Sequence, residues 1–369
     1  MVTCYYGNGS VRTELQYRNG TAHGVWRSWF ESGELEREEH WADGHLEGLQ
    51  TLYFPDGTKR AEITWARGCR KGVEVTWNEQ GQSVHQRHWQ DGQLHGLEVI
   101  WHGNGEKSSE RQFEAGVLHG YSVSWFETGQ KRTEGHFDHG DKTGEWVEWY
   151  GNGNQRAAGT LPSGTWTTWH RDGQKESDGE QLDGSEHGDW KYWDSNGHIK
   201  AEGGWAHGKR QGLWVHWFVN GHKKREANWG QGKENGSWTE WYPTGQMKQQ
   251  GQWLEGREHG NWRYWHANGE KAREGRWELG HEEGLWTSWF QDGIIEREYE
   301  YQDGKFHGKR RLYRKDGTLE SEGTYSGGLR HGAWRAFHKN GRLRSEAEFV
   351  SDRQQATLHL WDEQGRQIR

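Results

Sequence analysis

The chain has 369 residues, a formal net charge of -8, and a composition that is 30% hydrophobic and 28% charged. A mean hydropathy of -1.28 is typical of disordered chains, but an aromatic content of 14% excludes disorder throughout. The acidic balance disfavours a general nucleic-acid-binding protein, and no apolar run approaches the ~20 residues that span a bilayer. We therefore expect a thin array with a narrow aromatic core.

The beginning of the chain, MVTCYYGNGS, has no basic and apolar leader. The two cysteines, Cys4 and Cys69, are far apart in the sequence. They predict no disulfide framework, which favours a reducing compartment. The chain is accordingly expected to be soluble and cytoplasmic.

One glycine column runs from Gly9 to Gly365 in steps of 24 residues, apart from one step of 20. Such a period indicates stacked repeats. A second glycine column begins at Gly24, and aromatic residues follow it after two, five and 17 residues. We call these the Trp26, Trp29 and Trp41 columns after their first members in the complete repeats. Together they contain all 28 tryptophans.

Each repeat divides into two extended runs and a turn, as in 25–30, 31–33 and 34–41. Asn-Gly or Asp-Gly often ends the turn triplet, which is a strong hairpin signal. Pro55 and Pro243 stand at the first turn position, where a two-residue loop needs a backbone N–H group. We therefore predict a three-residue loop, formed by a type I turn that a left-handed glycine closes.

This loop places Trp29 opposite Leu35 and predicts that Trp29 shares a face with Arg27, Arg37 and Trp41. The Trp29 and Trp41 columns are then expected to form the core on one face. The Trp26 column is expected on the opposite face. The connectors between hairpins are too short for a helix, so the predicted fold is an all-β, elongated array of antiparallel β-hairpins with a 24-residue period.

The Trp26 column changes along the chain, with Gln50, Glu74, Glu98 and Ser122 in four early repeats and tryptophan in seven successive later ones. One interpretation is that these rings cover their own hairpins, above strand positions that are often glycine or alanine. The other is an exposed ladder for a partner, because tryptophan is frequent in interaction hot spots. The second interpretation makes seven residues candidate partner-binding residues: Trp146, Trp166, Trp190, Trp214, Trp238, Trp262 and Trp286.

Other columns predict structural roles. Successive histidines of one column, such as His95 and His119, should lie about 10 Å apart or more, too far for one ion with bonds near ~2.1 Å. We therefore expect turn roles, no metal site and no cofactor. A glutamate column that includes Glu226 and Glu274 lacks the asymmetry of a catalytic pair, so we expect structural ion pairs and no catalytic residue.

The repeat that contains 154–163 is four residues short and includes Pro162. This irregularity predicts a bend that divides the chain into an N-terminal block, 1–153, and a C-terminal block, 164–369.

The residues Trp217-Phe218-Val219-Asn220-Gly221 with Trp229, and Trp265-His266-Ala267-Asn268-Gly269 with Trp277, resemble the MORN repeat. The similarity is closer to the longer bacterial variant found in antitoxin-like proteins than to the shorter eukaryotic form. The resemblance covers almost the whole chain. It implies a scaffold of β-hairpins that binds proteins, membranes or, for the bacterial variant, a toxin.

The leading hypothesis for function is a non-enzymatic protein-binding scaffold, with an antitoxin or immunity protein that occludes a toxin surface as its specific form. The partner is then another protein and not a nucleic acid. The alternatives are a membrane-associated organiser that binds anionic lipid through its lysines, and a glycan-binding strip that uses tryptophan platforms.

Overall fold

The computed structural model describes residues 1–355 and 357–368, and the regular elements of these residues are all β-strands. The chain forms two compact units, Met1–Gly184 (unit 1) and Ser185–Arg369 (unit 2). The predicted all-β fold of antiparallel hairpins is confirmed. The bend at 154–163 and the blocks 1–153 and 164–369 remain a prediction.

Unit 1 contains nineteen short strands. They are β1 (Val2–Tyr5), β2 (Val11–Leu15), β3 (Tyr17–Arg18), β4 (Thr21–Ala22), β5 (Gly24–Trp29), β6 (Leu35–Ala42), β7 (His45–Leu46), β8 (Gly48–Tyr53), β9 (Lys59–Ala66), β10 (Cys69–Trp77), β11 (Ser83–Gln90), β12 (Gln93–Trp101), β13 (Lys107–Glu114), β14 (Val117–Trp125), β15 (Lys131–Asp138), β16 (Asp141–Trp149), β17 (Gln155–Leu161), β18 (Gly164–Trp169) and β19 (Lys175–Leu182).

Unit 2 continues the same alternation. Its strands are β20 (Ser185–Trp193), β21 (Ile199–Ala206), β22 (Lys209–Trp217), β23 (Lys223–Gly230), β24 (Lys233–Trp241), β25 (Met247–Leu254), β26 (Arg257–Trp265), β27 (Lys271–Glu278), β28 (His281–Trp289), β29 (Ile295–Gln302), β30 (Lys305–Tyr313), β31 (Leu319–Ser326), β32 (Leu329–Arg330), β33 (Gly332–Phe337), β34 (Leu343–Val350), β35 (Arg353–Gln354) and β36 (His359–Leu360).

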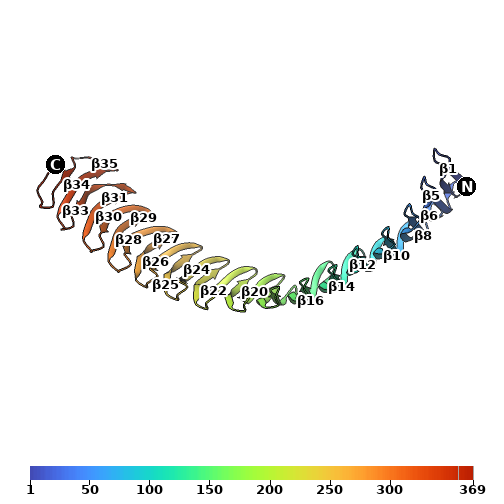
Figure 1. The fold of residues 1–369 in the computed structure, drawn as a ribbon, viewed down its shortest axis with the longest axis horizontal. Helices are drawn as coiled ribbons and strands as arrows, with labels where there is room; N and C mark the ends of the chain where they lie inside the picture. The colour runs from blue at the N-terminus through green and yellow to red at the C-terminus, as the bar shows by residue number, and fades with distance from the viewer. Residues whose placement is uncertain (356, 369) are drawn as a thin grey trace. The chain divides into compact units, whose positions relative to one another are not determined.

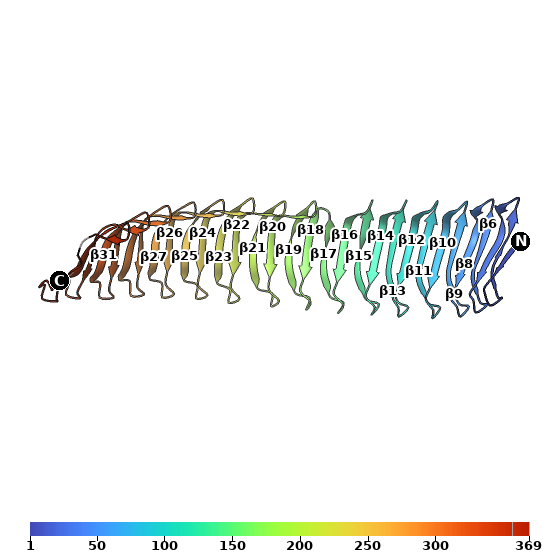
Figure 2. The same cartoon turned by 90° about the horizontal axis from the view of Figure 1, so that it is seen from above.

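Within each unit the strands follow one another in chain order, and each long strand pairs antiparallel with the long strands before and after it, as β13 pairs with β14 and β22 with β23 (Figures 1 and 2). Consecutive pairing needs only short hairpin connections, which agrees with the short period of the sequence.

The turn at one end of each hairpin is the predicted three-residue loop. In the first complete repeat the N–H of Phe30 donates to the Glu34 carbonyl at 2.8 Å, and the N–H of Gly33 donates to the Phe30 carbonyl at 2.9 Å. Gly33 has φ 104°, in the left-handed region that favours glycine. Pro55 and Pro243 occupy the corresponding turn position, and the same two hydrogen bonds close their loops.

The turn at the other end has two residues with positive φ, as in Asp43 (48°) and Gly44 (83°). They connect the paired residues Ala42 and His45, which is the arrangement of a type I′ turn. The following strand then accommodates extra residues at Glu47-Gly48 before regular pairing resumes. Gly48 has φ 91° there, and this bulge explains the second glycine column.

The predicted faces are wrong. Trp29 does pair with Leu35, but the register shifts between Ser28 and Trp29, so that Ser28 lies opposite Arg37. The extra residue is Glu36, whose carboxylate accepts a hydrogen bond from Ser28 Oγ at 3.0 Å. Because one extra residue reverses the alternation of side chains, the bulge moves Arg37, Glu39 and Trp41 to the face opposite Trp29.

Two faces result, and we name each by its contents. The core face carries the Trp26 and Trp41 columns, whose first members have ring centroids 4.7 Å apart. The paired-charge face carries the Trp29 column and ion pairs such as Arg27 with Glu38, at 2.6 Å.

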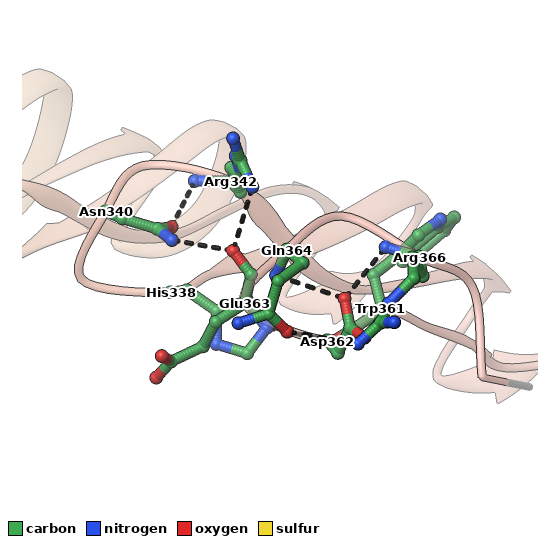
Figure 3. Close-up of polar contacts among 8 residues, drawn as sticks. All are labelled: His338, Asn340, Arg342, Trp361, Asp362, Glu363, Gln364 and Arg366. Atoms are coloured by element: carbon green, nitrogen blue, oxygen red, sulfur yellow. Dashed lines mark hydrogen bonds and ion pairs between the residues drawn. The ribbon is translucent and has the colours of Figure 1, made fainter.

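Side chains in the three-residue turns also connect successive repeats (Figure 3). Asn340 Nδ2 donates to the Glu363 carbonyl at 2.8 Å, while Asn340 Oδ1 accepts from the backbone N–H of Arg342 at 3.0 Å. One ring nitrogen of His338 lies 2.8 Å from the Trp361 carbonyl. Asn104 and Asn268 make the same contact to the next turn, at 2.7 and 2.6 Å. Asparagine before the turn glycine therefore stabilises both its own turn and the junction between repeats.

The shortened repeat replaces the type I′ connector with Pro162 and Ser163 between β17 and β18, and the Leu161–Pro162 peptide is cis. The two strands pair at three positions, from Ala157 opposite Thr168 to Gly159 opposite Trp166.

Candidate functional site

The structure buries the predicted partner-binding tryptophans. Exposed fractions are 2% for Trp146, 3% for Trp190, 1% for Trp214, 7% for Trp238, and 2% for both Trp262 and Trp286. Trp166 is half-buried. The prediction that these rings form an exposed ladder is therefore wrong, because buried rings offer no surface to a partner.

Glycine on the preceding strand makes this burial possible. A Cβ atom added at Gly203 would lie 2.4 Å from the Trp214 ring, and one at Gly251 would lie 2.2 Å from the Trp262 ring. The indole thus lies flat against the backbone. Its N–H group donates to a carbonyl ten residues earlier, at 2.9 Å for Trp214 to Gly204 and 3.1 Å for Trp262 to Gln252.

The Trp41 column completes the core with edge-to-face contacts. Trp205 meets Trp214 with centroids 5.2 Å apart at 89°, and Trp277 meets Trp286 at 5.4 Å and 81°. Long basic side chains cover the remaining ring surface, as Arg210 does over Trp214 at 4.3 Å. The rings therefore pack in the geometry that their quadrupoles favour, with a cation–π contact in addition.

In four early repeats the core face is polar instead. Glu98 has a side chain only 4% exposed, and its carboxylate lies 2.9 Å from Arg87 Nε and 2.6 Å from Arg111 Nη2. Three repeats earlier, Glu39 accepts from Gln50 Nε2 at 2.6 Å and from Trp41 Nε1 at 3.1 Å. These groups satisfy one another, so this part of the face is a structural network rather than a set of free charges.

A partly open cavity on the core face of unit 2 contains buried polar atoms without a hydrogen bond to a described residue. The cavity has a volume of about 220 Å³ and is lined by His216, Lys224, Arg225, Trp238 and Glu240. The ring atoms His216 Nδ1 and Trp238 Nε1 are buried, and neither makes a hydrogen bond with the described residues. Burial, together with neighbouring cations led by Arg225, lowers the pKa of His216 to about 4. The ring is thus neutral near pH 7.

The paired-charge face offers the accessible surface. Its lysines pair with carboxylates three residues later, as Lys59 with Glu62 at 2.5 Å and Lys271 with Glu274 at 3.0 Å. Lys271 Nζ also lies 5.3 Å from the ring centroid of Trp289, a member of the half-buried Trp29 column. This column was predicted to be core. It is instead a partly exposed aromatic row under paired charges.

Shallow grooves recur at one repeat position on this face. One, of about 440 Å³, is lined by Lys191, Glu202 and Leu213 among others, and a second, of about 420 Å³, by Arg263, Glu274 and Leu285. Leu213 is 51% and Leu285 is 53% exposed. A third groove lies at the same position, beside Arg311 and Glu322. Leu213 and Leu285 stand at the same repeat position, three repeats apart, and each lies exposed between opposite charges, which is a surface suited to a protein partner.

A signal for the buried tryptophans was present in the sequence. The residue eleven positions before each one is small, as in Gly135, Gly203, Gly251 and Gly275, whereas Arg87 stands eleven before Glu98. The grooves had no such signal, because they depend on the bulge that reversed the faces.

Six segments of the chain match the family described as MORN repeat variant: 22–43, 186–205, 234–254, 282–303, 306–326 and 330–351. The chain therefore contains MORN repeats. The matched MORN repeats lie in both units, and each covers one hairpin, in which a three-residue turn joins two strands. No curated protein matches the chain.

Among solved structures, the chain is similar to a complex of TcdB2 and TccC3 with Cdc42 at 10% identity and a TM-score of 0.16, and the match covers 97% of this chain and 22% of that chain. The complex of TcdB2 and TccC3 alone gives 9% identity, a TM-score of 0.16, and coverages of 97% and 23%. A Photorhabdus luminescens Tc holotoxin pore gives 9% identity and a TM-score of 0.15, and the match covers 92% of this chain and 23% of that chain. The chain thus spans less than a quarter of the length of those chains, and TM-scores this low do not establish a shared fold. The described residues contain no helix that could cross a membrane.

Proposed function

We propose that this protein is a non-enzymatic scaffold that binds another protein through its paired-charge face. The grooves with Leu213 and Leu285 carry this proposal, because each offers an exposed leucine between opposite charges at the same repeat position. Hot-spot residues typically lie in such depressions under a polar rim.

The specific role that we propose is that of a cytoplasmic antitoxin or immunity protein. A long scaffold blocks a partner by covering its surface and needs no catalytic group. Cys4 and Cys69 are both free and exposed, which fits a reducing compartment.

The test is a double variant, Leu213→Glu with Leu285→Glu. Both side chains are half exposed, so the fold should persist while co-purification of a stoichiometric partner falls at least tenfold. Val219→Glu is the matched control, because Val219 is 71% exposed but lies in a three-residue turn away from the grooves. Retention of the partner by the double variant would place the interface elsewhere.

The antitoxin role has a separate test. Deletion of the gene should stop growth of cells that carry an intact toxin gene beside it, and the double variant should fail to restore growth. Unaffected growth after deletion would remove the antitoxin role and leave the scaffold.

Anionic lipid is a weaker candidate partner for the same face. Lys59, Lys131 and Lys271 each bind a carboxylate of their own strand, which leaves less positive charge for a membrane. Flotation with anionic liposomes at low salt would favour the lipid alternative over a protein partner.

A further inference from the structure

Two neighbouring type I′ turns in unit 1 bring titratable side chains together. One turn, at Ala115-Gly116, connects β13 with β14, and the other, at His139-Gly140, connects β15 with β16. The N–H of Gly140 donates to the Leu118 carbonyl at 2.8 Å. Residues that flank the two turns are therefore held side by side.

Three of these residues form a compact group of potential metal ligands: His119, Asp138 and His139. His119 Nδ1 lies 3.3 Å from Asp138 Oδ1, and His139 Nδ1 lies 2.6 Å from the same oxygen. One ligand atom from each residue lies within 4.8 Å of the other two, and no other three such residues in 1–355 and 357–368 come this close. Tetrahedral coordination with bonds near ~2.1 Å needs ligand atoms about 3.4 Å apart, which small rotations of these exposed side chains provide.

A fourth residue, Glu114, lies on the other side of the His119 ring. Its Oε2 atom is 3.6 Å from His119 Nε2. A carboxylate there favours the tautomer with hydrogen on Nε2, which leaves the Nδ1 lone pair directed to the group. His119 Nδ1 is buried and makes no hydrogen bond with a described residue, although Asp138 is 3.3 Å away. The nitrogen is thus available as a ligand.

The corresponding positions of unit 2 provide an internal comparison. His187 and His207 have ring centroids 5.2 Å apart, close to the 5.4 Å between His119 and His139. Residue 206, however, is alanine where unit 1 has Asp138. The two histidines of each pair are 20 residues apart and belong to different columns. The spacing of histidines within one column therefore excluded no metal site between them.

We propose that His119, Asp138 and His139 bind a divalent transition-metal ion of the Zn²⁺ class, with water completing the coordination. Two imidazoles and one carboxylate form a ligand set that suits such ions. Glu114 is a positioning residue that fixes the His119 ring, as carboxylates commonly do behind a ligating histidine. The bound ion connects the two turns.

Titration of the full chain with Zn²⁺ by calorimetry tests the proposal. The tightest binding event should weaken at least tenfold in His139→Ala and in Asp138→Ala, and about tenfold in Glu114→Gln. His207→Ala is the matched control and should leave that event unchanged.

A gain of binding provides the second arm. Ala206→Asp supplies the missing carboxylate to His187 and His207 and should add one further Zn²⁺ site per chain. Equal Zn²⁺ affinity in the wild type and His139→Ala would overturn the proposal, as would an equal loss in His207→Ala. Circular dichroism of each variant should match the wild type, since Asp138 and His139 side chains are mostly exposed.

Discussion

Among the glycines that lie against core tryptophans, Gly275 leaves the least space between its backbone and the ring. A Cβ atom added there would lie 2.1 Å from the Trp286 ring. Real atoms do not approach so closely, so the indole must move and strain its hydrogen bond to the Arg276 carbonyl, now 3.2 Å. We expect Gly275→Ala to lower the free energy of unfolding by about 1–3 kcal/mol. Urea unfolding followed by tryptophan fluorescence measures the change.

Ala227 is the control that the chain itself provides. It stands where other repeats have glycine, and Trp238 beside it is 7% exposed with an indole N–H that makes no hydrogen bond to a described residue. The methyl group thus already displaces this ring. Ala227→Gly should change stability by less than about 1 kcal/mol, because the regained hydrogen bond offsets the flexibility of glycine. Equal costs for Gly275→Ala and Ala227→Gly would contradict this explanation of the burial.

The lowered pKa of His216 predicts how the stability of the chain depends on pH. Burial and Arg225 lower its pKa to about 4 in the folded chain, against about 6.5 in an unfolded one. The unfolded state therefore binds more protons between these values, and the free energy of unfolding falls as the pH drops from 6.5 to about 4. Because the side chain is only partly buried, we discount the contribution for solvent screening to about 1–2 kcal/mol.

The measurement compares wild type with His216→Gln by urea unfolding at pH 7 and pH 4.5. The variant should lose less stability between the two pH values. His222→Gln, which replaces an exposed histidine, should behave as the wild type. A pH profile that His216→Gln leaves unaltered would exclude His216 as the source.

The type I′ turn gives a prediction at the scale of the element. Its first position holds Leu279 with φ 50° and a side chain that is 43% exposed, although leucine adopts the left-handed region at a cost. Asparagine tolerates this region, so Leu279→Asn should raise the free energy of unfolding by about 0.5–1 kcal/mol. Asp303→Leu, at the equivalent position with φ 48°, should lower it by a similar amount. Thermal unfolding of both variants provides the measurement, and a Leu279→Asn variant less stable than the wild type would contradict the argument.

Local turn chemistry could be predicted from the sequence, whereas the register beyond the turn could not. Pro55 and the turn glycines specify a three-residue loop, and the structure has it. The bulge at Glu36 contains no glycine or proline, so the residue types do not predict it. This one residue reversed the expected faces. It made the Trp26 column core and turned the Trp29 column toward the paired charges. The candidate grooves were missed for the same reason.

At the scale of the whole molecule, the two units build the same hairpins on different cores. Unit 2 fills its core face with tryptophan from Trp190 to Trp286, while four repeats of unit 1 use Gln50, Glu74, Glu98 and Ser122. The residue opposite each of these positions on the preceding strand changes with it. Glycine lies against tryptophan, and Arg87 is paired with Glu98. Each core is thus a matched set across neighbouring strands, and exchange of one member alone should fail.

The triple variant Arg87→Gly, Glu98→Trp and Arg111→Gly tests this matching, because it copies the Gly251, Trp262 and Gly275 arrangement into unit 1. Glu98→Trp alone places an indole against two arginines with no glycine beneath it and should lower the free energy of unfolding by about 2–3 kcal/mol. The triple variant removes the buried charges with their partners, and such replacements are often neutral or stabilising, by up to about 3 kcal/mol. Urea unfolding of the wild type, the single variant and the triple variant gives the coupling between the sites. If the triple variant is as unstable as Glu98→Trp, the two cores are not interchangeable, and unit 1 requires its charged network for a reason other than packing.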